Sequence, residues 1–327
     1  MLEWIGVFFT YVFVSLVILA LLVFLVQKTI FSSLQSVENR HVFITGGSSG
    51  IGLALAQTYA KHGAKVSIVA RSRPSLEAAA KTLSSDRVFF ESCDATDATQ
   101  VEQVIQSSVK SLGQIDVLIC CAGNAHLDYF EYQNLDVFKR TMDLNFFGCL
   151  NPIMSVFPAM KARKSGKIVL IGSAMSLLGF TGNSSYAPTK WALRGLADCL
   201  RNEFLKYNIQ VHIAYPPDTK TPGYAKELTM RPKEIASVSP ESDAFSAQVV
   251  AERIYQDVQS GRYHVRSPDL IQDLLISLKT GVSPSPNVFF DVLVTPLVVL
   301  IAQGYNLYLD YLSKSIGAPA SVSKKAQ

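Results

Sequence analysis

The sequence predicts an α/β fold, in which a doubly wound, parallel β-sheet carries helices on both faces. From residue 41 onward, short apolar runs typical of buried strands alternate with amphipathic stretches typical of helices. The first apolar run leads directly into a glycine-rich turn. Candidate polar residues follow the ends of several runs, which is where ligands bind in open parallel sheets.

Six apolar runs are interpreted as strands, and the stretches between them as helices. The strands are expected at residues 41–45, 65–70, 87–91, 115–121, 167–172 and 209–215. Helices are expected at residues 99–112, 135–161 and about 246–260. No internal repeat interrupts this alternation, so a single dinucleotide-binding sheet is predicted.

Residues 4–26 carry no charge and predict a membrane anchor. As a helix they would span roughly 35 Å at ~1.5 Å per residue, enough for a bilayer core. A cleaved signal peptide is the alternative, but the start is acidic and no small-residue cleavage site follows. Lys28 and Arg40 follow the run, which places the remainder in the cytosol. We therefore expect a transmembrane segment at 1–28 and a linker at 29–40.

The catalytic domain is predicted at residues 41–270, with a polar lid loop at about 217–245. Membrane-associated helices and a tail are expected at 271–327. Within the tail, residues 288–302 are apolar but short for a clean span. An interfacial or re-entrant helix, a buried core helix and a full crossing all remain open for this run.

Composition excludes several classes of function. The 327 residues carry a net charge of +4 and show no dense basic patch with interleaved aromatic residues, so no nucleic-acid binding is expected. The five cysteines are odd in number and lack zinc-site spacing, so no metal is expected. Reduced, apolar cysteines suit a cytosol-facing domain.

The glycine-rich turn predicts a dinucleotide site. Glycines permit a tight turn and let the backbone approach a pyrophosphate, which the following helix N-terminus favours. The alternative, an ordinary loop, does not explain why a strand precedes the turn and a helical pattern follows it. This Rossmann-type motif supplies candidate cofactor contacts at Gly46, Ser48, Ser49, Gly50, Ile51 and Gly52.

The second strand ends at an arginine, where an NAD site would be expected to place a carboxylate. Arg71, with Ser48 and Arg73, is positioned to hold a 2′-phosphate through charge-assisted hydrogen bonds. The alternative is a solvated surface arginine. We therefore expect NADPH as the cofactor, which also suits a reductive direction.

Three further positions are candidate cofactor contacts. Asp94 follows the third strand and is placed either to accept from the adenine amino group or to cap the next helix. Ala122 and Gly123 end the fourth strand and would let the chain pass close to the cofactor.

Tyr186 and Lys190 lie four residues apart at the start of a predicted helix and so share one face. A nearby ammonium stabilises phenolate, and we expect it to lower the pKa of Tyr186 enough for acid catalysis near neutral pH. Ser173 follows the fifth strand, where it can hydrogen-bond a substrate oxygen and steady an alkoxide. Taken alone, a turn serine or a tyrosine–lysine pair in a helix would be unremarkable.

Together, the glycine turn, Asn145, Ser173, Tyr186 and Lys190 occur in the order of the short-chain dehydrogenase/reductase family. The chain resembles that family over about residues 41–266. The resemblance implies that Tyr186 is the general acid and that Lys190 binds the nicotinamide ribose. It also implies that Ser173 orients the carbonyl and that Asn145 holds a water in a proton relay.

One departure from the family pattern lies at the end of the fourth strand. Cys120 and Cys121 precede Ala122 and Gly123, where the family usually has Asn-Asn-Ala-Gly. The change weakens one structural hydrogen bond but touches no group that transfers a proton.

The segment from Tyr215 to Gly223, together with the anchor and the apolar tail, resembles the 3-ketodihydrosphingosine reductase family. That family uses NADPH to reduce 3-ketodihydrosphingosine to dihydrosphingosine at the cytosolic face of the endoplasmic reticulum. The resemblance implies cofactor contacts from Pro216, Thr219 and Thr221. Asp218 remains open between pairing with a substrate ammonium and capping a loop.

The implied partners are a long-chain lipid ketone, the bilayer and, through helices flanking the sheet, further copies of the chain as a homo-oligomer. Two other functions remain open. The chain could reduce another lipid ketone, such as a steroid, a retinoid or a 3-ketoacyl chain. It could also be a catalytically silent, NADPH-binding scaffold, although every catalytic position is filled.

Overall fold

The computed structural model describes residues 34–231, apart from 84 and 86, and residues 241–280. A few isolated positions are also described, all helical: Ser15, Ile18, Gly304, Leu307 and Tyr311. Apart from these positions, the predicted anchor at 4–26 and the apolar run at 288–302 lie outside the described residues. Within the described part of the chain, no helix is both long and apolar enough to cross a membrane.

The described residues form one large sheet of parallel strands in the order β3-β2-β1-β4-β5-β6-β9. The strands are β1 (His41–Thr45), β2 (Lys65–Ala70), β3 (Val88–Ser92), β4 (Ile115–Cys120), β5 (Gly166–Ile171), β6 (Ile209–Ala214) and β9 (His264–Val265). The predicted doubly wound, parallel sheet is therefore confirmed. The strand order reverses between β1 and β4, so their carboxyl ends border the crevice where ligands bind in such sheets.

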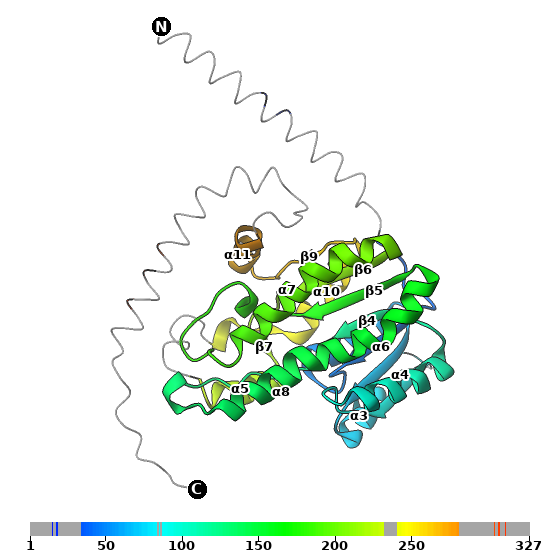
Figure 1. Ribbon diagram of the computed structural model, residues 1–327, viewed down its shortest axis with the longest axis horizontal. Helices are drawn as coiled ribbons and strands as arrows, with labels where there is room; N and C mark the ends of the chain where they lie inside the picture. Colours follow the sequence, from blue (N-terminus) through cyan, green and yellow to red (C-terminus); the bar gives the residue numbers. More distant parts are fainter. Residues whose placement is uncertain are drawn as a thin grey trace.

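Helices cover both faces of the sheet, and their apolar sides build two cores. One core joins the sheet to α2 (Gly50–Lys61), α3 (Arg73–Ala80) and α10 (Ala247–Gln259). The other joins it to α4 (Ala98–Leu112), α6 (Gly148–Arg163) and α7 (Ala187–Phe204), of which α6 and α7 lie in front of the sheet in Figure 1. Because both faces are covered, all five residues of β1 are buried, which explains its continuous apolar sequence.

The predicted helix at residues 135–161 is three segments in the structure. α5 (Leu135–Met142) leads into a π-helix (Asp143–Phe147), and α6 continues from it. π-bulges occur frequently at functional sites, and this one contains the fully buried Asn145. The amphipathic pattern continues through the bulge, so the sequence does not reveal it.

The predicted lid loop at residues 217–245 contains a helix, α8 (Pro222–Leu228), so the expectation of a loop is wrong there. Thr221 caps α8 by accepting a hydrogen bond from the Tyr224 amide over 3.0 Å. A capping threonine followed by proline is a standard helix start, and both residues were visible in the sequence. The strands on either side, β7 (Thr219–Lys220) and β8 (Phe245–Ser246), pair in parallel.

The folded domain extends beyond its predicted end at residue 270. Helix α11 (Leu270–Thr280) packs Ile276 into the core beneath α4, α6 and α7. The Gln272 amide donates to the Tyr215 carbonyl over 2.5 Å, and Arg194 donates to the Lys279 carbonyl over 2.7 Å. These contacts tie α11 to the end of β6 and to α7.

Candidate active site

The glycine turn between β1 and α2 is held tightly against β2 and β4. Gly46 has a φ of +69°, and a Cβ there would lie 2.9 Å from the backbone of Ala122. Its amide donates to the Val69 carbonyl over 2.8 Å. A Cβ on Gly52 would lie 2.3 Å from the Gly46 carbonyl oxygen. Glycine is therefore required at both positions, by conformation at one and by close approach at both.

The start of α2 fits the pyrophosphate of a dinucleotide. Its N-cap residue, Ser49, is extended and its side chain accepts no amide hydrogen bond. The first amides of the helix therefore keep free donors, and the positive end of the helix dipole favours an anion. Gly50 lies against Thr221, whose Cγ2 would be 3.0 Å from a Cβ at Gly50. The predicted contact residue Thr221 thus borders the same turn.

The two arginines predicted at a 2′-phosphate differ in the structure. Arg73 pairs with Glu77 over 3.1 Å and lies 5.8 Å from the centre of the Phe90 ring. Arg71 is exposed at the carboxyl end of β2, where its backbone carbonyl accepts from Ser92 over 2.7 Å. No ion pair engages Arg71 within the described residues, so it is the better placed of the two to receive a phosphate.

Asp94 is not the cap of the helix that follows it. Asp97 caps α4 by accepting from the Thr99 and Gln100 amides. Asp94 instead accepts from the amide and the hydroxyl of Thr96, over 2.9 and 2.8 Å, through Oδ1. The alternative interpretation as a helix cap is therefore wrong, and the adenine contact stays a prediction.

A threonine on β1 orders the end of β4 where the family's usual asparagine is missing. The Thr45 hydroxyl accepts from the amides of Cys121 and Ala122, each over 3.1 Å. The next residue, Gly123, meets two predicted catalytic residues. A Cβ there would lie 3.0 Å from Asn145 Oδ1 and 3.6 Å from Lys190 Nζ. The end of β4 is thereby fixed against the catalytic helices.

The Asn145 amide joins three segments of the site. Its Oδ1 accepts from the Asn124 amide, and its Nδ2 donates to the Asn124 carbonyl, each over 2.9 Å. The second Nδ2 hydrogen reaches the Thr189 hydroxyl over 3.0 Å. That hydroxyl donates to the Tyr186 carbonyl over 2.7 Å. One donor of Asn145 is thus committed to the chain after β4 and the other to the first turn of α7, and a water can use only the remaining capacity of Oδ1.

Ser173 and Tyr186 come together at the carboxyl end of β5. Ser173 caps a short 3₁₀-helix (Ala174–Ser176): its hydroxyl accepts from Met175, and its amide donates to the Ser176 hydroxyl. Tyr186 is the N-cap residue of α7. The Ser173 side chain lies close enough to that of Tyr186 to lower the pKa of Tyr186. The structure therefore joins the two residues predicted to contact a substrate oxygen.

The pKa of Tyr186 differs from the sequence expectation. Burial raises the pKa of Tyr186, the carboxylates of Glu227 and Asp218 raise it further, and the Ser173 side chain offsets only part of the rise. The pKa of Lys190 is itself lowered by burial. The Lys190 ammonium also donates to the Ile171 carbonyl over 2.9 Å. Tyr186 consequently keeps its proton at neutral pH, as a proton donor must.

Two acidic residues from the lid segment raise the pKa of Tyr186, and sequence reasoning missed one of them. Asp218 ion-pairs with Arg231 and accepts from the Tyr224 hydroxyl over 3.2 Å. Glu227, on α8, was not singled out because the helix was interpreted as a loop. The cap at Thr221 and Pro222 is the signal that could have revealed it, since Glu227 follows Tyr224 by one helical turn.

Pro216 and Thr219, the remaining predicted cofactor contacts, are both buried where the chain leaves β6. The Thr219 hydroxyl donates to the Pro217 carbonyl over 2.6 Å. The Thr219 hydroxyl hydrogen is therefore used within the loop. The hydroxyl oxygen can still accept a hydrogen bond from a ligand.

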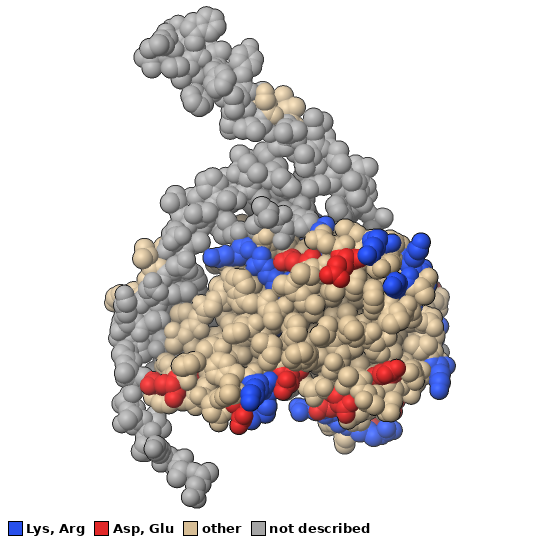
Figure 2. Space-filling view, in the orientation of Figure 1, with Lys and Arg blue, Asp and Glu red and all other residues tan. Residues whose placement is uncertain are grey.

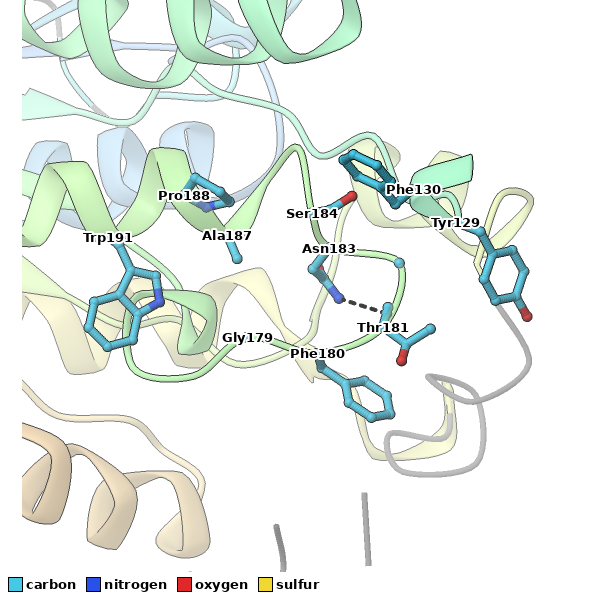
Figure 3. Close-up of a pocket in the computed structure, with 11 residues that line it drawn as sticks. Tyr129, Phe130, Gly179, Phe180, Thr181, Asn183, Ser184, Ala187, Pro188 and Trp191 are labelled. Carbon is cyan, nitrogen blue, oxygen red and sulfur yellow. Dashed lines mark hydrogen bonds between the residues drawn. The ribbon is translucent and has the colours of Figure 1, made fainter. Parts of the chain in front are cut away.

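A pocket of about 560 Å³ lies beside the first turns of α7. Its walls come from the loop at 179–184, from the first turns of α7 and from Tyr129 and Phe130. Figure 3 shows Trp191 on the α7 side, Tyr129 on the opposite side and the Phe180 ring between them. The volume falls within the range of about 300–1,000 Å³ typical of small-molecule sites. Its aromatic lining suits an apolar ligand.

The family profile described as short chain dehydrogenase matches residues 40–231. The chain belongs to the short-chain dehydrogenase family. It is 37% identical to a 3-dehydrosphinganine reductase of Danio rerio, over 82% of this chain and 83% of that protein. It is 35% identical to a 3-ketodihydrosphingosine reductase of Dictyostelium discoideum, over 82% and 87% respectively. Among solved structures, ElxO with NADP bound has 28% identity and a TM-score of 0.63, covering 70% of this chain and 96% of that one.

In this short-chain dehydrogenase, the four predicted catalytic residues converge from three segments. Ser173 follows β5, Tyr186 and Lys190 begin α7, and Asn145 lies in the π-helix. Gly46 and Gly123 bring the ends of β1 and β4 to the same crevice. Of the two arginines predicted to hold a 2′-phosphate, Arg73 is turned to another partner, Glu77.

Proposed function

We propose that this protein uses NADPH to reduce 3-ketodihydrosphingosine to dihydrosphingosine. The observation that carries the proposal is the meeting of Ser173 and Tyr186 at the carboxyl end of the sheet, with Lys190 one helical turn beyond Tyr186. Two relatives of more than a third identity bear the names of enzymes for this reaction. The exposed Arg71, in the absence of a carboxylate at the end of β2, supports NADPH over NADH.

The chain's own groups suffice for the proton chemistry of this reduction. Bound NADPH supplies the hydride to the ketone carbon. Tyr186 is protonated at neutral pH and donates its phenolic proton to the ketone oxygen as charge develops there. Ser173 hydrogen-bonds the same oxygen and stabilises the alkoxide. Lys190, anchored on Ile171 and close to Gly123, provides positive charge beside the phenol and a donor for the cofactor ribose.

The substrate class follows from the pocket beside the first turns of α7. Its aromatic lining from Phe130, Phe180 and Trp191 favours burial of an alkyl chain by the hydrophobic effect. Ser184 and Ala187, on either side of Tyr186 in the sequence, also line it. An alkyl chain in this pocket would therefore lie against the start of α7, the helix that carries Tyr186 and Lys190.

The proposal is tested by following NADPH oxidation by the purified full-length protein. 3-Ketodihydrosphingosine is compared with a steroid ketone, retinal and a 3-ketoacyl thioester of similar chain length. We expect the highest kcat/KM for 3-ketodihydrosphingosine and formation of dihydrosphingosine in equal amount to the NADPH consumed. Faster turnover of another ketone would assign a different lipid substrate. Binding of NADPH without turnover of any ketone would indicate a silent scaffold.

The membrane anchor belongs to the same proposal. An uncharged run at residues 4–26 supports a transmembrane segment in the endoplasmic reticulum, with the catalytic domain in the cytosol. A long-chain ketone partitions into lipid, so the anchor would hold the site where the substrate is. The full chain should float with liposomes and resist alkaline extraction, whereas a chain lacking residues 1–28 should be extracted. Protease protection of the domain in sealed microsomes would contradict the cytosolic orientation.

A homo-oligomer through the helices flanking the sheet is also part of the proposal. Charged side chains gather along two edges of the face that carries α6 and α7, with a largely uncharged band between them (Figure 2). Met154 on α6 and Trp191 on α7 are exposed on these helices. Light scattering of the detergent-solubilised protein should give a multiple of the chain mass, and Met154→Asp should reduce it. A monomeric wild-type protein would contradict this assembly.

A further inference from the structure

Glu227 is a carboxylate beside the catalytic pair that has no assigned role. It follows Tyr224 by one turn of α8 and so lies on the same face of the helix. Tyr224 is only 5% exposed, which shows that this face is turned into the domain. Glu227 itself is half-buried. Among the carboxylates that act on Tyr186, Glu227 has a larger effect than Asp218.

The neighbouring acid, Asp218, is already engaged. It forms an ion pair with Arg231, whose side chain is 5% exposed, and accepts from the Tyr224 hydroxyl. The Arg231 guanidinium also lies 5.3 Å from the centre of the Tyr224 ring. Asp218 is therefore less available than Glu227 as the partner of a substrate ammonium, because a buried guanidinium compensates its charge.

Glu227 has charged neighbours but no hydrogen-bond donor among the described residues. Burial raises the pKa of Glu227 to about 7, the nearby Asp218 adds to the rise, and Arg231 and Lys190 oppose it. An incoming cation favours the ionised form of such a carboxyl, so binding of the cation and loss of the proton are linked. The groups that face it from α7 are Tyr186 and Lys190.

The proposed substrate carries an ammonium on the carbon next to the ketone. When the ketone oxygen reaches Ser173 and Tyr186, that ammonium lies one carbon from the reacting centre. A cation in such a buried place requires an anionic partner close to Tyr186. We propose that Glu227 binds the substrate ammonium and thereby selects ketones that carry an amine beside the carbonyl. This inference rests on the proposed function.

The test compares two ketones of equal chain length in the wild type and in Glu227→Gln. One is 3-ketodihydrosphingosine, and the other is the matching 1-hydroxy-3-ketone without the amine. We expect Glu227→Gln to lower the ratio of kcat/KM, aminoketone over amine-free ketone, by about 10–100-fold, the size of a charge-assisted hydrogen bond. Glu203→Gln, an exposed glutamate on α7, serves as the matched control and should keep the wild-type ratio.

The pH dependence supplies a second measurement. The wild-type KM for the aminoketone should fall as the pH rises through about 7, because Glu227 becomes ionised. This fall should be absent in Glu227→Gln. NADPH binding, followed by fluorescence, confirms that the variant is folded, and Glu227→Ala provides a second variant for the same comparison.

The outcomes separate the two proposals. An active wild type whose preference between the ketones is unchanged in Glu227→Gln overturns the inference about Glu227 alone. A variant that loses turnover of both ketones equally also overturns it, since Glu227 would then act on Tyr186 rather than on the amine. A wild type that reduces neither ketone overturns the proposed function itself.

Discussion

The Lys190 ammonium donates to the Ile171 carbonyl over 2.9 Å, which joins the start of α7 to the last residue of β5. Ser173 lies two residues beyond Ile171, and Tyr186 lies one helical turn before Lys190. A single hydrogen bond therefore fixes the spacing between the two halves of the catalytic site. Lys190 therefore has a structural role in positioning α7 against β5, in addition to any role in binding a cofactor.

Replacing Tyr186 with phenylalanine should remove the proton donor while leaving the ring in place. We expect kcat to fall by about 10²–10⁴-fold, the usual contribution of a general acid. NADPH affinity, measured by fluorescence titration, should persist because the ring and Lys190 remain. A variant that retains most of its turnover would exclude Tyr186 as the acid.

Arg71 should determine the preference for NADPH over NADH. Arg71→Ala should raise the KM for NADPH by roughly 10–100-fold, since a charged hydrogen bond to a phosphate is lost, and should affect NADH little. Arg73→Ala is the matched control, because Arg73 already pairs with Glu77. Steady-state kinetics with both cofactors gives the comparison. Equal effects of the two substitutions would contradict the assignment.

Gly46 and Gly195 should respond in opposite ways to alanine. At Gly46, a φ of +69° and a Cβ 2.9 Å from Ala122 predict a loss of at least about 1–2 kcal/mol in stability and weak NADPH binding. At Gly195, inside α7 with nothing within 4 Å of the new Cβ, alanine should stabilise by about 0.5–1 kcal/mol. Thermal unfolding measures both. A neutral Gly46→Ala variant would show that the turn is less constrained than its geometry indicates.

Two buried histidines should make the fold sensitive to acid. Burial lowers the pKa of His212 to about 4 and that of His264 to about 3. Both lie below the value of about 6.5 for an unfolded histidine, so the unfolded chain takes up protons first as the pH falls. Stability is then complete above about pH 6.5 and declines toward pH 4, by up to about 1.4 kcal/mol per pH unit for each histidine.

Urea unfolding at several pH values measures this loss. The His212→Asn variant keeps a donor for the Arg262 carbonyl, which His212 Nδ1 contacts over 2.7 Å. It should reduce the pH slope by about one proton, and an unaltered slope would show that His212 does not cause the acid sensitivity.

The parallel sheet could be predicted because its strands are buried on both faces and stand out as apolar runs. β1 and β2 have the predicted bounds, β4 and β6 end one residue earlier than predicted, and β3 and β5 are shifted by one residue. β9 was missed, since two residues are too few to form a recognisable run. A strand that is buried along its whole length can thus be predicted from the sequence. A short edge strand cannot, because it forms only by pairing with the neighbouring strand.

The candidate site was only partly predictable for a related reason. Ser173, Tyr186 and Lys190 lie at fixed places on regular elements, so spacing sufficed to bring them together. The ion pair of Asp218 with Arg231 and the inward face of α8 depend on how the chain folds back after β6. The pKa of Tyr186 was predicted in the wrong direction, because burial and two carboxylates raise it.

The Thr45 hydroxyl accepts hydrogen bonds from two backbone amides at the end of β4, and this affects which substitutions the chain tolerates. Because Thr45 on β1 binds the backbone amides there, the side chain at position 121 does not have to form a hydrogen bond. The Cys121 thiol next to the catalytic helix stays protonated and therefore unreactive as a nucleophile, because burial raises the pKa of Cys121 to about 12. The order of the chain after β4 therefore depends on the side chain of Thr45 and not on that of residue 121. Substitution should be tolerated at position 121 but not at Thr45.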